Sequence, residues 1–200
     1  MIKRNLRISA ILCGLLSIIV TAAFSQTQPK KDFPNIRIKN FGQMDENYYR
    51  GARPKKEDFQ SLADLGVKTV IDLTDKPKDY EKPAVEALGM KYINIPMSDK
   101  SYPTEEAIAT FLQLVNDPNT GTFFVHCAGG RHRTGVMGAV YRFNKYGWDY
   151  DMAYKEMKNY DFYTRWGHGA MKDFVIDYAS KLKTAGTQAA EQVKAGEGNK

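Results

Sequence analysis

Residues 122–135 read TFFVHCAGGRHRTG, and this stretch decides the fold. The run TFFV has too few polar positions to alternate, as expected for a strand that is buried on both faces. The run VMGAVYRF that follows at residues 136–143 has apolar residues at helical spacing. The stretch therefore predicts a buried strand, a short loop rich in glycine and positive charge, and a helix.

Strands and helices alternate on both sides of this stretch. Extended runs are predicted at 47–54, 67–74, 90–97 and 122–127, and helices at 55–66, 82–89, 103–117, 133–147, 149–160 and 169–183. This alternation indicates an α/β domain with a central, mostly parallel sheet of four to five strands flanked by helices. Ligands of such sheets bind beyond the carboxyl ends of the strands, where the loop after residue 127 lies.

The N-terminal 25 residues are set apart by their composition. A basic start, MIKRNLR, is followed by the apolar run ISAILCGLLSIIVTAAF and by small residues at Ala23 and Ser25. This order is typical of a secretory signal peptide, so we expect cleavage before Gln26 and an exported protein, periplasmic or secreted. The alternative is an uncleaved anchor, although the run is shorter than the roughly 20 residues that span a bilayer comfortably. This uncleaved segment would be the only part of the protein expected to contact a membrane.

Removal of residues 1–25 changes the charge and the cysteine content. The formal net charge falls from +6 to +3, which gives no reason to expect a nucleic-acid partner. Of the two cysteines only Cys127 remains, and an unpaired thiol in an exported protein requires a chemical reason. Residues 26–183 are the predicted domain, expected to be a monomer, and the polar residues 184–200 a disordered tail or frayed helix.

The loop between strand and helix predicts an anion-binding site. Five residues separate Cys127 from Arg133, namely Ala128, Gly129, Gly130, Arg131 and His132. A turn of this length directs backbone N–H groups to one centre at the positive end of the following helix. Gly129 and Gly130 permit positive φ and let the backbone approach the anion closely. The planar guanidinium of Arg133 can hold two oxygens of a phosphate.

The same positive field favours the thiolate of Cys127. The pKa of a cysteine falls at helix N-termini and beside cations, and only the thiolate is nucleophilic. A thiolate beneath a bound phosphate is placed for in-line attack, which gives a phosphocysteine. The Thr134 hydroxyl is close enough in sequence to hydrogen-bond the sulfur. His126 should point to the opposite face of the strand, as a buried brace for the loop.

The segment HCAGGRHRTG resembles the HCxxGxxR[ST]G signature of the cysteine-dependent protein tyrosine and dual-specificity phosphatases. The segments YYRGARP, LADLGVKTVIDL, YINIPMSD and YRFNKYGWDYDMAYKEMKNYDF are similar to those of the compact, bacterial branch of this family. The resemblance implies that Cys127 is the nucleophile, Arg133 the phosphate clamp and Thr134 the hydroxyl that assists departure of the thiolate. It implies no cofactor.

The family also uses an aspartate on an earlier loop as proton donor to the leaving group. Asp99, in IPMSDKSYP, follows the strand predicted at 90–97 and is the expected donor. Asp117 is expected at the wrong end of the sheet, Asp72 lies inside a predicted strand, and Asp75 is a more distant alternative.

Other functions fit the residues less well. A metal site is not expected, because His126 and Cys127 point to opposite strand faces and no second cysteine or acidic pair joins them. A thiol redox enzyme would need a resolving cysteine. An inactive phosphate-binding module would be expected to lack Cys127, Arg133 or Asp99, and all three are present.

The substrate stays open between two classes. A phosphotyrosine protein, with phosphoserine and phosphothreonine as further substrates, is the main expectation. Because Arg131, His132 and Lys100 would add charge to the rim, an inositol phosphate or a phosphoinositide lipid is the alternative. The aromatic, glycine-containing segment DFYTRWGHG at 161–169 is a candidate pocket wall that the sequence does not place.

Overall fold

The structure is a computed structural model that describes residues 31–197 of the chain, with side chains to residue 192. The signal peptide predicted at residues 1–25 lies outside the described residues. Within them, no helix combines the length and the apolar character needed to cross a membrane.

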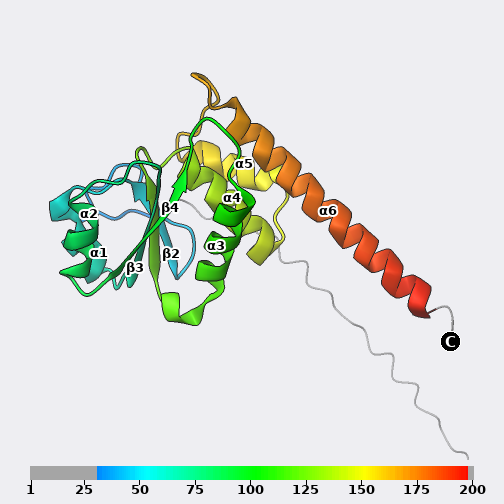
Figure 1. The fold of residues 1–200 in the computed structure, drawn as a ribbon, viewed down its shortest axis with the longest axis horizontal. Coiled ribbons are helices and arrows are strands. Elements are labelled where there is room, and N and C mark those ends of the chain that lie inside the picture. Colours follow the sequence, from blue (N-terminus) through cyan, green and yellow to red (C-terminus); the bar gives the residue numbers. More distant parts are fainter. Residues whose placement is uncertain (1–30, 198–200) are drawn as a thin grey trace, which may run out of the picture.

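A five-stranded sheet forms the centre of the fold (Figure 1). Its spatial order is β1-β2-β5-β3-β4, with β1 antiparallel to β2 and the other neighbours parallel. The strands are β1 (Gly42–Gln43), β2 (Tyr48–Ala52), β3 (Thr69–Thr74), β4 (Lys91–Met97) and β5 (Phe123–Cys127). The central strands β2, β3 and β5 are buried along their whole length, which explains why TFFV shows no polar alternation.

Helices cover both faces of the sheet. The short helices lie on one face: η1 (Lys56–Asp58), α1 (Phe59–Asp64) and α2 (Glu81–Glu86). The longer ones lie on the other, in the order α3 (Glu105–Asn116), α4 (Arg133–Tyr146), α5 (Tyr150–Asn159) and α6 (Gly169–Glu197), and η2 (Pro118–Thr120) precedes β5. Each face has its own apolar cluster, centred on Phe124 with Phe59 and Leu62 for the first and on Val125 with Val140 for the second.

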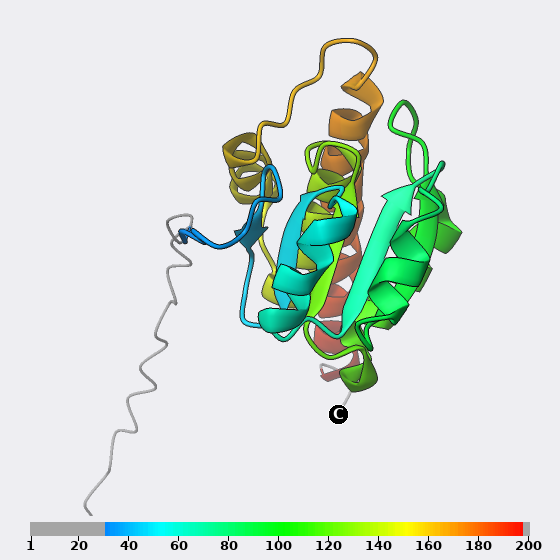
Figure 2. The ribbon, with the colours of Figure 1, turned by 90° about the vertical axis from the view of Figure 1, so that its left-hand side faces the viewer.

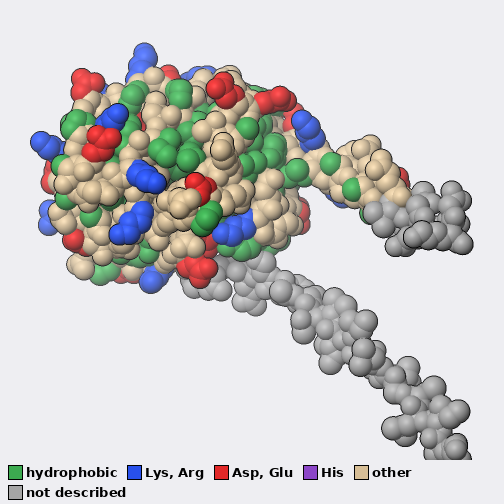
Figure 3. Space-filling view, turned by 60° about the horizontal axis from the view of Figure 1, so that its bottom comes forward, with side chains coloured by type: hydrophobic (Ala, Val, Ile, Leu, Met, Phe, Trp, Pro, Cys, Tyr) green, Lys and Arg blue, Asp and Glu red, His purple; other side chains and the backbone are tan. Residues whose placement is uncertain are grey.

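The predicted α/β architecture is confirmed, with two differences. The strand β1 was not predicted, because its two residues are too few to show an alternation of polar and apolar side chains. The final helix is longer than predicted, because α6 continues through residues 184–197, where a disordered tail or frayed helix was expected. Residues 184–192 of this helix are exposed, so its C-terminal part projects from the body (Figure 3). The face in Figure 3 intersperses Lys and Arg with Asp and Glu side chains instead of gathering one sign.

The topology places three loops at one edge of the sheet. Since β3, β4 and β5 are parallel, the segments after Thr74, Met97 and Cys127 all leave from the carboxyl ends. Figure 2 shows that the loop after β4 (green) and the loop before α6 (orange) reach the same edge. This is the edge at which parallel sheets bind ligands.

Candidate active site

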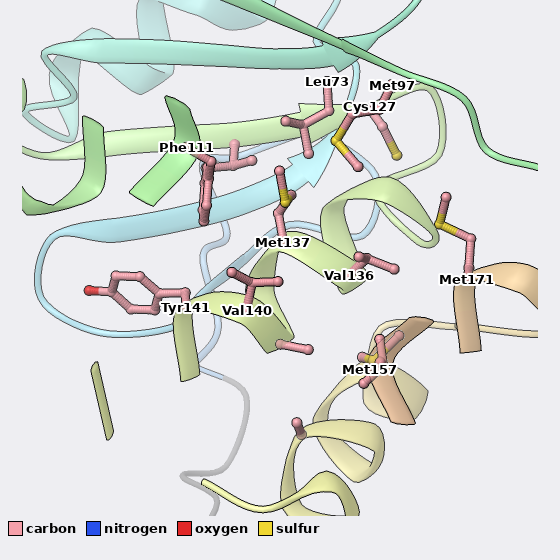
Figure 4. Packing of buried hydrophobic residues seen from close by; sticks show 14 of the residues in the cluster. Leu73, Met97, Phe111, Cys127, Val136, Met137, Val140, Tyr141, Met157 and Met171 are labelled. Carbon is pink, nitrogen blue, oxygen red and sulfur yellow. The ribbon is translucent and has the colours of Figure 1, made fainter. Parts of the chain in front are cut away.

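Cys127 ends β5, at the centre of the carboxyl edge. Its side chain belongs to the apolar cluster beneath α4 and is only 3% exposed. Figure 4 shows the sulfur near Leu73 and Met97, with Val136 and Met137 of α4 below. The polar groups near the thiol come from the loop that follows and from the first turn of α4.

Three carbonyl groups of the loop accept hydrogen bonds from residues outside the loop. Asn40 Nδ2 donates to Gly130 O at 3.0 Å and to Gly129 O at 3.5 Å, and the Arg53 N–H donates to Ala128 O at 3.4 Å. In a trans peptide the N–H points away from the preceding carbonyl. The N–H groups of residues 129–131 therefore face the inside of the loop, above Cys127, as an anion cradle requires.

One of the two glycines, Gly130, leaves no room for a side chain. Gly130 has φ of +65°, and a Cβ there would lie 2.4 Å from the Gly51 carbonyl carbon and 2.5 Å from Ala52 N. Both glycines permit positive φ, and the loop uses this freedom at Gly130 and not at Gly129. A Cβ at Gly129 would meet Arg131 Nη1 at an ordinary 3.6 Å. The loop turns at Gly130, where it passes against the end of β2.

The surroundings of Cys127 favour the thiolate. Burial alone would raise the pKa of the thiol, but the Thr134 side chain and N–H, the Arg133 charge and the Gly129 N–H together bring the pKa below its ordinary value. The Thr134 hydroxyl is buried and has no other hydrogen-bond partner among the described residues. A lowered pKa is characteristic of a reactive cysteine, since only the thiolate attacks.

Arg133 is fixed by one end of its guanidinium. Its Nη1 donates to Asp75 Oδ1 at 2.9 Å and to Met97 O at 3.0 Å. Its Nε is buried and has no hydrogen-bond partner among the described residues. The side chain is thus anchored while a second N–H group stays available for an oxyanion.

A second arginine, Arg50, supports the loop from below, and the sequence did not assign it a role. It is fully buried in β2, its Nη2 donates to Gly130 O at 2.8 Å, and its guanidinium carbon lies 4.0 Å from the Tyr160 ring centroid. Within residues 31–192 no carboxylate forms an ion pair with it. Arg50 thus brings an additional positive charge close to the cradle. The signal in the sequence was its place in YYRGARP, a segment that is similar to one in the phosphatase family.

His126 points to the face opposite Cys127, as predicted. It is fully buried, with Nε2 at 3.2 Å from Glu81 Oε2 and Nδ1 at 3.7 Å from Asp72 Oδ1. These three are the one His, Cys, Asp and Glu cluster of the described chain with metal-ligand spacing. An acidic pair therefore does join His126, contrary to the expectation from the sequence, because Asp72 and Glu81 are distant in the chain. The two carboxylates lie at opposite edges of the ring, one at Nδ1 and one at Nε2. Glu81 also pairs with Arg53 at 2.8 Å, which connects the brace to the loop.

The candidate acids occupy different environments. Asp75 is exposed and contacts Arg133; burial would raise its pKa, but the Arg133 hydrogen bond and charge hold the pKa below its usual range. A carboxylate kept ionised by Arg133 is a poor proton donor. Asp99, in the loop after β4, is half-buried and forms no ion pair within the described residues. Asp72 is buried inside β3, and Asp117 caps η2 before β5, at the opposite end of the sheet.

Of the two residues expected at the rim of the Cys-x5-Arg loop, His132 is buried and Arg131 is partly exposed. His132, expected at the rim or in solvent, is only 8% exposed. Burial and then His168 lower the pKa of His132 to about 4, so the ring is neutral near pH 7. Arg131 is partly exposed and borders a cleft of about 490 Å³ together with Lys39 and Asp161.

Comparison with known proteins gives the family. A family model described as "DSP-PTPase phosphatase fused to NAD+ Kinase" matches residues 29–172. The chain belongs to this DSP-PTPase phosphatase family. The resemblance drawn from HCAGGRHRTG is confirmed.

Individual phosphatases agree with this membership. The chain is 29% identical over 119 residues to the dual specificity protein phosphatase TpbA of Pseudomonas aeruginosa, covering 60% of this chain and 53% of that protein. It thus spans about half the length of this relative. A putative tyrosine-protein phosphatase, OCA1 of Mycosarcoma maydis, is 31% identical over 108 residues, covering 52% of this chain and 68% of that protein.

Solved structures agree with the fold. The TpbA crystal structure matches with a TM-score of 0.65 at 25% identity, covering 80% of this chain and 97% of TpbA. The core catalytic domain of the PP-IP phosphatase SIW14 from S. cerevisiae, in complex with citrate, matches with a TM-score of 0.63 at 21% identity, covering 78% of this chain and 95% of that domain. The second match supports the fold alone.

Proposed function

We propose that the protein hydrolyses phosphomonoesters through a phosphocysteine formed on Cys127. The observation that carries this proposal is the position of the thiol. It is 3% exposed, lies beneath the inward N–H groups of a Cys-x5-Arg loop, and has a pKa below the ordinary value. Such a site binds a phosphate and presents a thiolate to its phosphorus atom.

In the first step the Cys127 thiolate attacks phosphorus. A sulfur–phosphorus bond forms while the phosphorus–oxygen bond to the leaving alcohol or phenol breaks. Asp99, protonated at this stage, transfers its proton to the leaving oxygen. The loop N–H groups and Arg133 stabilise the charge on the three other phosphoryl oxygens.

In the second step water releases the phosphoryl group. The Asp99 carboxylate accepts a proton from the water, whose oxygen attacks phosphorus. The sulfur–phosphorus bond then breaks, and the Thr134 side chain and the loop amides stabilise the departing thiolate. Inorganic phosphate leaves, and the protonated acid and the thiolate are restored. Side chains and backbone groups perform every step, so the proposal includes no metal or cofactor.

Phosphotyrosine proteins are the proposed substrates, with phosphoserine and phosphothreonine as further candidates. TpbA, a relative over most of the described domain, is named a dual specificity protein phosphatase. The cleft beside Gly129 bears on a second candidate. Lys39 and Arg131 border it and would attract further phosphates, against the opposing charge of Asp161, whose Oδ2 lies 3.8 Å from Arg131 Nη2. That candidate is an inositol phosphate or a phosphoinositide lipid. Two relatives, one from Arabidopsis thaliana and SIW14, are named inositol diphosphatases.

A substrate panel with Cys127→Ser as control tests both the mechanism and the substrate class. Residues 26–200 would be assayed on phosphotyrosine and phosphoserine peptides, inositol phosphates and phosphoinositide vesicles. Activity on at least one class, abolished in Cys127→Ser and unaffected by EDTA, supports the proposal. Retained activity in Cys127→Ser contradicts the covalent mechanism, and loss of activity with EDTA contradicts the metal-free one. Phosphate binding without turnover would identify an inactive phosphate-binding module.

We also propose that the protein is exported, periplasmic or secreted, and acts as a monomer without nucleic acid. The support is the basic, apolar and small-residue order of residues 1–25 and the net charge of +3 after their removal. Cell fractionation and N-terminal sequencing of the expressed full chain test this. A mature N-terminus at Gln26 outside the cytoplasm is expected, and a cytoplasmic protein that retains Met1 would contradict it.

A further inference from the structure

The segment between α5 and α6 packs on the Cys-x5-Arg loop through His132. The His132 ring stacks on the His168 ring, with centroids 3.6 Å apart and planes 15° from parallel. Its Nε2 lies 3.1 Å from Tyr163 O, and its ring also contacts the edges of Tyr163 and Phe162. Since a carbonyl oxygen only accepts, Nε2 carries the proton and donates. His132 is thereby fixed from two sides.

His168 connects this stack to the loop that carries Asp99. Its Nδ1 lies 2.8 Å from the Asp99 carbonyl oxygen, so Nδ1 carries a proton and donates to it. Its Nε2 lies 3.4 Å from Lys100 Nζ, which suits an acceptor nitrogen of the neutral tautomer. His168 is only 6% exposed. One buried imidazole thus contacts both the Asp99 loop and the Cys-x5-Arg loop.

The Asp99 loop has few other attachments. Within the described residues they are hydrogen bonds from Lys100 Nζ to Trp166 O and from Tyr102 Oη to Asp177 at the exposed surface, and an edge contact of the Tyr102 ring with Phe174. The bond from Lys100 N to Ser98 Oγ, at 3.0 Å, lies within the loop. None of these reaches the backbone of Asp99 itself. A displacement of about 1 Å can cost about 10²-fold in rate, so the bond from His168 matters to the position of this acid.

We propose that His168 is a positioning residue that holds Asp99 in place relative to Cys127 and Arg133. Its Nδ1–H donates to the Asp99 carbonyl oxygen, and its ring stacks on His132 of the Cys-x5-Arg loop. The two loops are thereby held in a fixed relative position. The inference rests on the proposed function, because it assumes that Asp99 is the proton donor. His168 itself touches neither substrate nor the reacting atoms.

The test compares two substrates that differ in leaving group. 4-Nitrophenyl phosphate releases a phenol that needs little protonation, whereas phenyl phosphate needs the acid. His168→Phe keeps an aromatic ring for the stack and removes the N–H donor. We expect it to lower kcat/KM for phenyl phosphate by about 10-fold or more, and for 4-nitrophenyl phosphate by less than about 3-fold. Added to Asp99→Asn, it should produce no further loss on phenyl phosphate.

Two further variants separate positioning from folding. His168→Asn keeps an N–H donor near the position of Nδ1 and should retain most of the rate on phenyl phosphate. Trp166→Ala alters an exposed side chain of the same segment and should leave both substrates unchanged. Inhibition by vanadate, which reports on the Cys-x5-Arg loop, should be unchanged in all three variants.

Several results would overturn the inference. These are an equal loss on both substrates in His168→Phe, no loss on either, a further loss in the double variant, or a His168→Asn that behaves like Asp99→Asn. If His168→Phe does not fold, the comparison of His168→Asn with Asp99→Asn decides. Failure of the proposed function is distinct: Asp99→Asn would then show no dependence on the leaving group, or Cys127→Ser would stay active.

Discussion

The loop from Cys127 to Arg133 and the loop that carries Asp99 meet at one edge of the sheet, but the fold holds them differently. The first loop begins in a fully buried strand and ends in a 14-residue helix, and buried Arg50 and half-buried Asn40 bind its carbonyl groups. The loop after β4 has no regular structure at Asp99, whose backbone is held by His168 alone among the side chains described.

Under the proposed mechanism, the difference separates a preorganised site for the nucleophile from an acid on a loop with few contacts. Groups that bind charge in the transition state are most effective when they need not reorganise. A proton donor must approach the leaving oxygen and later a water molecule, and a loop with few buried contacts opens at small free-energy cost. Variants in the first loop should therefore affect all substrates, and variants in the second only those with poor leaving groups.

The largest effect is expected at Arg133. Arg133→Lys keeps the charge but loses the planar pair of N–H donors, so kcat/KM should fall by about 10²–10³-fold on every substrate. Steady-state kinetics on phenyl and 4-nitrophenyl phosphate measure this. A loss confined to phenyl phosphate would break the comparison, because Arg133 would then act with the acid.

The comparison of Asp99→Asn with Asp75→Asn tests which aspartate is the proton donor. Asp99→Asn should lower kcat/KM on phenyl phosphate by about 10²-fold, with a much smaller loss on 4-nitrophenyl phosphate. Asp75→Asn removes a negative charge beside the anion site but keeps an oxygen acceptor for Arg133 Nη1, so vanadate and phosphate should bind more tightly. Measurement of kcat/KM on phenyl and 4-nitrophenyl phosphate for both variants identifies the acid. If Asp75→Asn shows the leaving-group dependence instead, the assignment is reversed.

The rigidity of the first loop is tested by its two glycines. Gly130→Ala combines positive φ, which costs about 1–3 kcal/mol, with overlap against backbone atoms of Gly51 and Ala52, so the free energy of unfolding should fall by more than about 3 kcal/mol. Gly129→Ala meets only ordinary contacts and should change it by less than about 1 kcal/mol. Urea unfolding measures both. Equal losses would contradict the different roles of the two glycines.

The smallest effect is expected at Thr134. Because the pKa of Cys127 is below its ordinary value, alkylation by iodoacetamide should stay fast as the pH falls below the usual titration range of a thiol. Thr134→Val removes one group that lowers this pKa, so the midpoint of the pH–rate curve should move upward. An unchanged midpoint would assign the lowered pKa to the backbone and Arg133 instead.

The first loop is more predictable from the sequence than the second, for a physical reason. Cys127, Arg133, Thr134 and the five residues of the cradle are consecutive, so strand, loop and helix constrain them locally. The contact of Asp75 with Arg133 joins residues 58 positions apart, and the bond from His168 to Asp99 spans 69 positions. Such contacts depend on how the ends of β3 and β4 and the segment before α6 pack, which no local pattern encodes.

Burial also limited what could be predicted. His132 lies in a polar stretch and gives no sign that aromatic residues of a distant segment enclose it. Arg50 lies in a strand whose neighbours are apolar, yet its bond to Gly130 O crosses 80 positions. Gly129 and Gly130 both permit positive φ, but only Gly130 adopts it, because residue type permits the conformation without requiring it.

The most direct test of the account is to trap the phosphocysteine. Asp99→Asn, which should slow the release of phosphate by water, would be mixed with 4-nitrophenyl phosphate, quenched in acid within milliseconds and digested for mass spectrometry. The account predicts one phosphoryl group on the peptide containing Cys127, in an amount equal to the burst of nitrophenol, and none in Cys127→Ser. A nitrophenol burst or steady turnover without phosphoryl on Cys127 would contradict it.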